Sequence, residues 1–560
     1  MRDLPPNMTD YLATRASFRL EVPKTYNYAR DVVDAWATRE PGKLALLAVG
    51  PDGGNPRRFS FADLAASSNR AANFLAARGV RKGDRVFVML PRIPDWYDVM
   101  LACIKLGAVP TPGTTLLTAR DIAYRLERAG ATAVVTDAEG AGKVDLAAES
   151  LGLEPLQRLL VGEPGAGDAV PSGWSSWAEG LQAANDRPPE VEPTRSDDPL
   201  LIYFTSGTVA TKMVLHTQAS LGIGHQITAR FWQDLKPSDL HWTLSDFDWA
   251  KAAWGKLFGQ WALGAANFLW DLRGKPDFDL LLRLIGEQRV TTFCAPPTVF
   301  RALVLEDLSR YDWSSLRHCV SAGEPLNPEV IKVWQQATGL TIYDGYGQTE
   351  TVNLLANYRC MPVRPGSMGK PTPGFDVCVV DDDGKVLDPG EEGHVAVRVS
   401  PERPVGLFQE YWRDPEATAA AFHGEWYYTG DRAHVDEDGY FWFVGRSDDV
   451  IISSAYRIGP FEVESALVEH VAVAEAAVVG KPDPDRGQIV KAFVVLAPGR
   501  AGSEDLAREL QEHCKQVTAP FKYPREVEFV EELPKTISGK IRRIELRERE
   551  IEVSNRADSG

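Results

Sequence analysis

The fold is decided around residues 201–217, which read LIYFTSGTVATKMVLHT. Two apolar runs, Leu201–Phe204 and Met213–Leu215, enclose a loop with three hydroxyls around Gly207 that is followed by Lys212. The pattern predicts a strand, a loop and a second strand. Hydroxyls, backbone N–H groups and a lysine on a tight loop suit the oxygens of a polyphosphate. A Ser/Thr-rich hairpin turn fits this stretch equally well when it is taken alone.

The whole chain has the composition of a globular protein with more than one domain. Its 560 residues exceed one ordinary core. The net charge of −17 argues against general binding to nucleic acid or to an anionic membrane. Its six cysteines form no CxxC pair, and its nine histidines form no HExxH motif. This pattern argues against a disulfide framework or a zinc cluster and favours a reducing compartment, so we expect a cytoplasmic protein without a membrane span.

Strand and helix patterns alternate in the first part of the chain. Helical spacing of apolar residues at 28–39, 61–77 and 95–106 is interrupted by strand patterns at 44–49 and 79–90. Such alternation implies a mainly parallel sheet that is covered by helices. Residues 161–193 are rich in Gly, Pro, Ser and Asp, so we expect a surface excursion there.

Three strands, the one that ends at Phe204 included, are expected to run directly into loops, at Thr205, Gly323 and Gly345. Open α/β sheets bind ligands at the carboxyl ends of their strands, so these loops are expected to gather at one site. From Val377 onward, short runs that read as antiparallel strands predict a β-rich subdomain. The polar, flexible stretch 445–449 marks a domain boundary.

The expected fold class is therefore α/β. We expect a large N-terminal domain of helix-covered sheets (1–446) that includes a small β-rich subdomain at about 377–446. A small, mobile α+β C-terminal domain (447–560) follows, with helices expected at 460–469 and 503–514 and a charged helix after Ile541.

Several motifs occur in a fixed order along the chain, and chance agreement of all of them is remote. They are TSGT at 205–208 with Lys212, GEP at 323–325, YGQTE at 346–350, YTGD at 428–431, GRSDD at 445–449, YRIGP at 456–460, and PKT at 534–536 with GK at 539–540. This order resembles the adenylate-forming superfamily. The wording SDFDWAKAAW, DGYGQTE, YRIGPFEVESAL and LPKTISGKIRR is most similar to its medium-chain acyl-CoA synthetases and benzoate-type CoA ligases.

The resemblance implies an ATP-dependent ligase that joins a carboxylic acid to coenzyme A. The carboxylate attacks the α-phosphate of ATP, which gives an acyl-adenylate and pyrophosphate, and the CoA thiol then displaces AMP. Anionic partners must meet in the first step, so positive charge is needed where negative charge develops. The resemblance gives that role to Lys540. It assigns Mg²⁺ to Glu350 and a hydrogen bond with the α-phosphate to Thr349.

The remaining roles that the resemblance implies fall into three groups. The residues expected to bind ATP or AMP are Thr205, Ser206, Gly207, Thr208, Lys212, Gly323, Glu324, Pro325, Asp344, Gly345, Tyr346, Gly347, Gln348, Asp431, Arg446 and Arg457. The acyl pocket is expected to be lined by Trp249, Ala250, Lys251, Ala322 and Gly347. The hinge and the CoA passage are expected at Asp448, Ser453, Ser454, Ala455 and Tyr456.

The acyl pocket carries a clue to the substrate. Acetate-specific relatives have tryptophan where this chain has Gly347, so a medium-chain, branched or aromatic acid is expected to fit. Lys251 is expected either to meet a polar substituent of the acid or to face solvent.

Two departures from the family pattern keep other functions open. The phosphate loop is one residue short at Val209-Ala210-Thr211, and Ala455 stands where the family has glycine. One alternative is an adenylating enzyme that passes the acyl group to a carrier-protein thiol. Another is a nucleotide-binding homologue with impaired catalysis. The sequence leaves the oligomeric state open, a homo-oligomer included.

Overall fold

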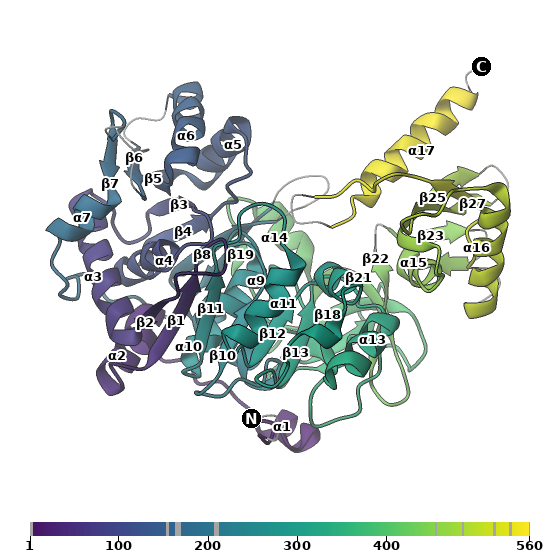
Figure 1. Ribbon diagram of the computed structural model, residues 1–560, viewed down its shortest axis with the longest axis horizontal. Helices are drawn as coiled ribbons and strands as arrows, with labels where there is room; N and C mark the ends of the chain where they lie inside the picture. The colour runs from purple at the N-terminus through teal and green to yellow at the C-terminus, as the bar shows by residue number, and fades with distance from the viewer. Residues whose placement is uncertain are drawn as a thin grey trace.

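The computed structural model describes residues 4–152, 156–162, 170–205, 212–447, 449–453, 456–483, 486–518, 522–536 and 540–558 (Figure 1). A large body holds the chain up to β22, and a smaller body with its own sheet follows at the right of the view. Within the described residues, none of the helices has both the length and the apolar character needed to cross a membrane.

The central sheet of the large body has nine strands, and its core is parallel. The strand order is β16-β15-β14-β13-β12-β10-β11-β1-β2, and every pair from β14 to β1 is parallel. The antiparallel partners lie at the two edges. The strands are β1 (Leu44–Val49), β2 (Arg57–Ser60), β10 (Leu240–Thr243), β11 (Ala266–Trp270), β12 (Thr292–Ala295), β13 (His318–Ala322), β14 (Ile342–Tyr346), β15 (Leu355–Ala356) and β16 (Lys370–Pro371).

A second, wholly parallel sheet is formed between β2 and β10 of the chain, in the order β4-β3-β5-β6-β7. Its strands are β3 (Arg85–Met89), β4 (Val109–Pro112), β5 (Ala131–Thr136), β6 (Gln157–Leu160) and β7 (Trp174–Ser176). Helices α3 (Phe61–Ala77) and α4 (Asp95–Leu106) have the predicted ranges. They pack against each other. The expected surface excursion at 161–193 is wrong in part, because β7 joins this sheet and Trp177 of α7 (Trp177–Ala183) is buried.

The stretch around residues 201–217 forms the predicted hairpin. Strands β8 (Pro199–Phe204) and β9 (Met213–Thr217) pair antiparallel, and both are almost wholly buried. The base of the loop is closed by Thr205 and Lys212: the Thr205 N–H donates to the Lys212 carbonyl at 2.8 Å, and the Lys212 N–H donates to Thr205 Oγ1 at 3.1 Å. Residues 206–211 lie outside the described part. Strand β9 also pairs with β19 (Glu410–Tyr411), a segment about 200 residues later in the chain.

The β-rich subdomain is an antiparallel sheet of β17 (Val377–Val380), β18 (Gly393–Arg398), β20 (Phe422–His423), β21 (Trp426–Val435) and β22 (Phe441–Arg446). It packs on the large body through a shared apolar cluster that includes Val377, Val397, Tyr427, Val352 and Leu354. The register of β21 on β22 sets Asp431 opposite Arg446.

The C-terminal body is an α+β module with a core of its own. It contains β23 (Ile451–Ser453), β24 (Tyr456–Ile458), α15 (Pro460–Val468), β25 (Val473–Asp483), β26 (Gly487–Leu496), α16 (Glu504–Val517), β27 (Glu526–Phe529) and α17 (Arg543–Asp558). Residues from both of its first two helices and from its strands share one buried cluster. Helix α17 extends from this body toward the C-terminus, and the segment before it runs back toward the large body (Figure 1).

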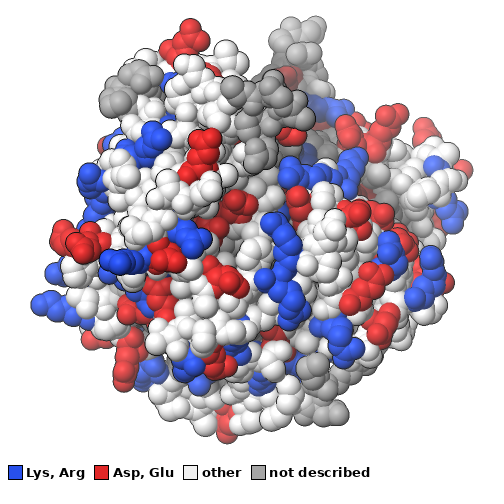
Figure 2. All heavy atoms as spheres, turned by 60° about the vertical axis from the view of Figure 1, so that its left-hand side comes forward, with Lys and Arg blue, Asp and Glu red and all other residues white. Residues whose placement is uncertain are grey.

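The surface carries both signs of charge. Figure 2 shows Lys and Arg interspersed with Asp and Glu over the face that it presents. A broad basic field of the kind that binds nucleic acid is not seen on that face, in agreement with the net charge of −17.

Candidate active site

The site begins where β13 and β14 end side by side. The two strands are parallel, with Ala322 opposite Gly345, so the loops that follow leave the sheet at the same edge. Gly323 has a φ of +115°, a left-handed conformation that only glycine adopts without strain. The Gly345 N–H donates to Asp344 Oδ1 at 3.0 Å, and the Asp344 side chain is buried beneath the loop. The sequence therefore placed two of its three loops correctly.

The Asp431 carboxylate is the centre of a polar web. It accepts hydrogen bonds from the Tyr346 hydroxyl, from Gln348 Nε2 at 2.7 Å and from Arg446 Nη1 at 3.2 Å. Burial raises its pKa, and the Arg446 guanidinium opposes the rise. The web joins the β14 loop to the β-rich sheet and holds a carboxylate in a fixed position at the edge of the site.

Glu350 lies near Lys212, at the base of the loop between β8 and β9. The Tyr411 hydroxyl donates to Glu350 Oε1 at 2.8 Å, and Lys212 Nζ lies 4.4 Å from the centre of the Tyr411 ring. Burial raises the pKa of Glu350; the hydrogen bond from Tyr411 and the charge of Lys212 act in the opposite direction. Lys212, at the base of the third predicted loop, is thus linked through Tyr411 to the segment that follows β14, although β8 and β9 belong to a different sheet.

Lys540 is held at the end of a narrow turn. Lys535 and Ile541 form a β-bridge, the Thr536 N–H donates to the Lys540 carbonyl at 2.8 Å, and the Lys540 N–H donates to Thr536 Oγ1 at 3.1 Å. Residues 537–539 lie outside the described part. The turn presents the Lys540 ammonium to the large body.

The ammonium of Lys540 is close enough to the site to respond to its charges. The residue as a whole is exposed, while desolvation of its ammonium by neighbouring atoms lowers the pKa. The carboxylates of Glu324, Asp431 and Glu350 raise this pKa, and Arg446 lowers it further. Charges on the segments after β13 and β14 and on β21 and β22 therefore act together on Lys540.

The predicted acyl-pocket residues lie beside the same strand ends. Trp249 directly precedes the short helix α9 (Ala250–Ala252), and Lys251 Nζ donates a hydrogen bond to the Ala322 carbonyl. Lys251 therefore turns toward the end of β13. Its contact with a polar substituent of the acid stays a prediction. Burial lowers the pKa of Lys251 to about 8, and the charge of Lys540 contributes to the shift.

The space beside Gly347 is already occupied by another tryptophan. A Cβ atom placed on Gly347 would lie 2.4 Å from Cη2 of Trp254. Trp254 is buried, donates from Nε1 to the Thr351 carbonyl at 3.2 Å, and packs edge-on against Trp232. The absence of a side chain at position 347 therefore leaves no free space there, because the Trp254 ring fills it.

Other predicted residues have structural partners or lie outside the described part. The Glu324 carboxylate accepts from the Thr298 N–H at 3.0 Å and from Arg301 at 3.1 Å, so its side chain caps α12 (Pro297–Leu303). The Thr349 carbonyl accepts from His216 Nε2 at 2.7 Å. Ser453 is buried on β23, and Tyr456 is half-exposed. The predicted residues that lie outside the described part are Ser206, Gly207, Thr208, Asp448, Ser454, Ala455 and the side chain of Arg457.

Asp344 makes the stability of the protein depend on pH. Burial raises the pKa of its carboxyl from 3.8 to about 8, so the folded state keeps a proton that the unfolded chain releases. Stability from this group is therefore lost as the pH rises. We expect a loss of about 1 kcal/mol per pH unit between roughly pH 5 and 8 for the ligand-free protein.

The matching variant is Asp344→Asn, which keeps the shape of the side chain and removes the titration. Urea unfolding of both proteins across this pH range is expected to show a flatter dependence for the variant. Equal slopes in the two proteins would contradict the assignment.

Comparison with known proteins agrees with this geometry. The AMP-binding enzyme family matches residues 33–412, and the AMP-binding enzyme C-terminal domain matches residues 462–540. The mitochondrial acyl-coenzyme A synthetase ACSM3 of Mus musculus is 47% identical over 558 residues, covering 98% of this chain and 94% of its own. The mitochondrial acyl-coenzyme A synthetase ACSM4 of Homo sapiens is 48% identical over 557 residues, with the same coverage of 98% and 94%.

Solved structures agree as well. The anthranilate CoA ligase AuaEII, determined with anthranoyl-AMP, superposes with a TM-score of 0.84 at 32% identity, covering 94% of this chain and 98% of its own. A benzoate CoA ligase from Burkholderia xenovorans LB400 superposes with a TM-score of 0.80 at 29% identity, covering 93% and 100%.

The expected cytoplasmic location is wrong. Relatives that span almost the whole chain at 46–48% identity are mitochondrial proteins. Free, scattered cysteines indicate a reducing compartment and do not distinguish one such compartment from another.

Both family matches, the long relatives and the shared fold lead to the same conclusion, and they confirm the resemblance drawn from the motifs: the chain belongs to the AMP-binding enzyme family.

Proposed function

We propose that the protein is an AMP-forming ligase that joins a carboxylic acid to coenzyme A through an acyl-adenylate. The observation that carries this proposal is the approach of Lys540, on the C-terminal body, to the charged edge formed by Glu324, Glu350, Asp431 and Arg446 on the large body. An ammonium that reaches a carboxylate-rich edge from a separate body suits a reaction in which a nucleotide is first bound and then attacked.

In the first step, a carboxylate oxygen of the acid bonds to the α-phosphorus of ATP, and the bond to the β-phosphate oxygen breaks. Negative charge builds up on the oxygens around phosphorus, where the Lys540 ammonium would stabilise it. Asp431, already fixed by Tyr346 and Gln348, would accept hydrogen bonds from the two ribose hydroxyls. Lys212 would contact the β- and γ-phosphates of ATP.

Glu350 fits the role of the protein ligand for Mg²⁺. Magnesium commonly binds through one or two carboxylates together with substrate phosphates and water. One carboxylate beside the phosphates, as Glu350 would supply, matches this mode. When bound, the ion would neutralise charge on the phosphate oxygens, and Tyr411 would keep Glu350 oriented.

In the second step, the CoA sulfur bonds to the carbonyl carbon, and the bond from that carbon to the AMP oxygen breaks. We propose that the C-terminal body turns between the steps about a boundary at 446/447, which withdraws Lys540. The segment 453–457 would then face the CoA thiol. Such gating by a few hinge residues is common among enzymes with a closing domain.

The function is tested by following pyrophosphate and AMP release with a panel of C4 to C10 acids and benzoates. We expect release that depends on the acid, with acyl-CoA formed when CoA is present. Absence of acyl-CoA with every acid would contradict the proposal. Transfer to a carrier-protein thiol without CoA turnover would select the carrier-dependent alternative, and ATP binding without pyrophosphate release would select the impaired homologue.

We propose that the acid is of medium length, branched or aromatic, and that Trp254 sets how far its chain can extend. Trp254→Ala is expected to shift preference toward longer acids, by roughly fourfold in kcat/KM for each methylene that the enlarged pocket buries. The measurement is kcat/KM for a homologous series of acids. Trp254→Phe serves as the control and should give an intermediate shift. An unchanged ratio between long and short acids would rule out this role of Trp254.

A further inference from the structure

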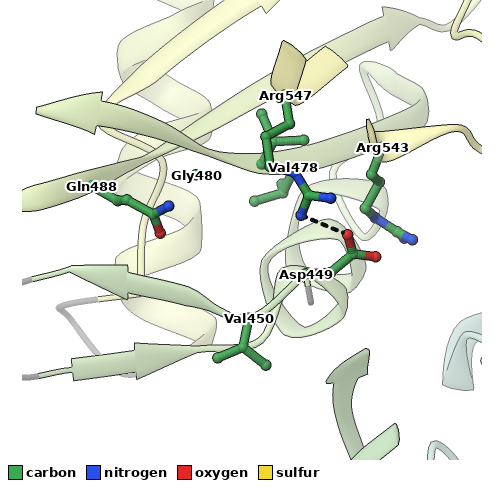
Figure 3. A pocket seen from close by; sticks show the side chains of 8 residues that line it. Asp449, Val450, Val478, Gly480, Gln488, Arg543 and Arg547 are labelled. Carbon is green, nitrogen blue, oxygen red and sulfur yellow. Dashed lines mark hydrogen bonds and ion pairs between the residues drawn. The ribbon is translucent and has the colours of Figure 1, made fainter. Parts of the chain in front are cut away.

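Helix α17 connects the turn that carries Lys540 to the neighbourhood of the predicted hinge. Two arginines on the helix, Arg543 and Arg547, are four residues apart and so project from the same face. Both line a small cavity of about 100 Å³ together with Asp449, Val478 and Gln488 (Figure 3).

The first arginine anchors the Lys540 turn. Arg543 follows Lys540 by three residues and makes two parallel hydrogen bonds with Glu464 of α15, at 2.8 and 2.6 Å. Glu464 is buried and also accepts from the Val478 N–H at 2.9 Å, so its position is fixed by β25. Paired bonds between a guanidinium and a carboxylate give orientation as well as strength. The chain just after Lys540 is therefore tied to the core of the C-terminal body.

The second arginine anchors the chain just after the domain boundary. Arg547 Nη1 donates to Asp449 Oδ1 at 3.0 Å, as the dashed line in Figure 3 shows. Both side chains are mostly shielded from solvent, at 21% and 16% exposure, so the pair is screened much less than an exposed one. Asp449 follows position 448, where the sequence predicts the hinge.

Two further contacts fix the first half of α17 to the same body. Leu546 is buried, and Glu550 is buried in an ion pair with Lys491 of β26 at 2.7 Å. The span from Arg543 to Glu550 is therefore held at several points, and its backbone hydrogen bonds keep these points at fixed distances from one another.

We propose that α17 acts as a strut that makes Asp449 and Lys540 parts of one rigid body, with Arg543 and Arg547 as positioning residues for adenylation. The rotating body would then begin at or before Asp449, and Lys540 would move with Asp449 as part of the same rigid body. This inference rests on the proposed function, in which Lys540 must reach the nucleotide and later withdraw. Adenylation needs Lys540 at one place, whereas the thioester step needs it only to be absent, so the two steps should respond differently.

The first test is Arg547→Met, which keeps most of the volume of the side chain and removes the charge. We expect adenylation, measured as pyrophosphate release, to slow about 10- to 100-fold, because small misplacements of a reacting group cost this much. KM for ATP and the thioester step from supplied acyl-adenylate should stay within about twofold of wild type, since neither needs Lys540 in place. The matched control is Arg508→Met on α16 of the same body, where Arg508 pairs with Asp505 at the surface.

A purely structural role would slow both half-reactions equally, and that result would overturn the proposal. The double variant Asp449→Asn/Arg547→Met should be no slower than either single variant, because both remove one pair. If the rate losses of the two single variants added in the double variant, that result would also contradict the proposal. Arg547→Lys is expected to restore part of the adenylation rate.

Hydrogen exchange tests the strut without relying on activity. Arg543→Met should speed exchange of the backbone N–H groups of Thr536 and Lys540, and Arg547→Met that of residues 449–453, relative to Arg508→Met. Faster exchange in a protein that forms no acyl-CoA would support the strut and reject the proposed function. Unchanged exchange in an active enzyme would reject the strut alone.

Discussion

Replacement of Lys540 by alanine is expected to lower the rate of acyl-adenylate formation by about 100- to 1,000-fold. The ammonium is the cation that the C-terminal body brings to the carboxylate-rich edge, and the charge on the α-phosphate oxygens would lose this partner during the first step. The thioester step from supplied acyl-adenylate should remain close to wild type, because there the lysine has withdrawn. The measurement is pyrophosphate release for the first step and acyl-CoA formation for the second.

Lys535→Ala is the control, because Lys535 belongs to the same turn and pairs with Glu475 on the surface of the C-terminal body. It should leave adenylation within about twofold of wild type, as exposed ion pairs contribute little. Equal loss of both half-reactions in Lys540→Ala would contradict the role given to this lysine.

Glu350→Gln is expected to lower adenylation by about 100-fold or more, because a neutral amide cannot replace a carboxylate as a ligand of a hard cation. The amide keeps the size of the side chain and can still accept from the Tyr411 hydroxyl, so the fold should be little changed. The measurement is the rate of pyrophosphate release at increasing Mg²⁺ concentration, together with calorimetric binding of ATP with and without Mg²⁺.

Tyr411→Phe separates the carboxylate from its support. It removes the hydroxyl that orients Glu350 and leaves the charge in place, so a smaller loss of about tenfold is expected. If Glu350→Gln kept the wild-type response to Mg²⁺ in both measurements, Glu350 would not be the ligand.

The sequence predicted the parts of the site that follow directly from strand ends. Glycines after two apolar runs indicated the loops at Gly323 and Gly345, and parallel pairing of β13 with β14 brings them together. The family resemblance, and not the pattern by itself, indicated Asp431 and Arg446, and the register of β21 on β22 sets these two residues opposite each other. These relations are local or follow from one pairing, so a sequence pattern can express them.

The residues that sequence reasoning missed come from long-range packing. Tyr411 reaches Glu350 because β19 adds to β9, and a two-residue strand leaves no periodic signal. Trp254 fills the space beside Gly347 from a separate wide-turn helical segment, η4 (Ala253–Leu257), almost one hundred positions earlier. Its sequence signals were its place at the end of SDFDWAKAAW and its position five residues after Trp249, and both also fit an ordinary core aromatic.

The ion pairs of α17 show the same limit. The sequence predicted a charged helix after Ile541 without partners for its charges, and Arg543, Arg547 and Glu550 each meet a partner on the C-terminal body. A charge run on a helix has no feature that tells an exposed face from one that pairs with a neighbouring sheet.

The most direct measurement of the central claim is the fate of the carboxylate oxygen. An acid labelled with ¹⁸O in its carboxylate is incubated with the enzyme, ATP, Mg²⁺ and CoA, and the products are analysed by mass spectrometry. Formation of an acyl-adenylate predicts that one labelled oxygen appears in the phosphate of AMP and that pyrophosphate carries none. Label in inorganic phosphate with ADP as the nucleotide product, or AMP free of label, would contradict the account.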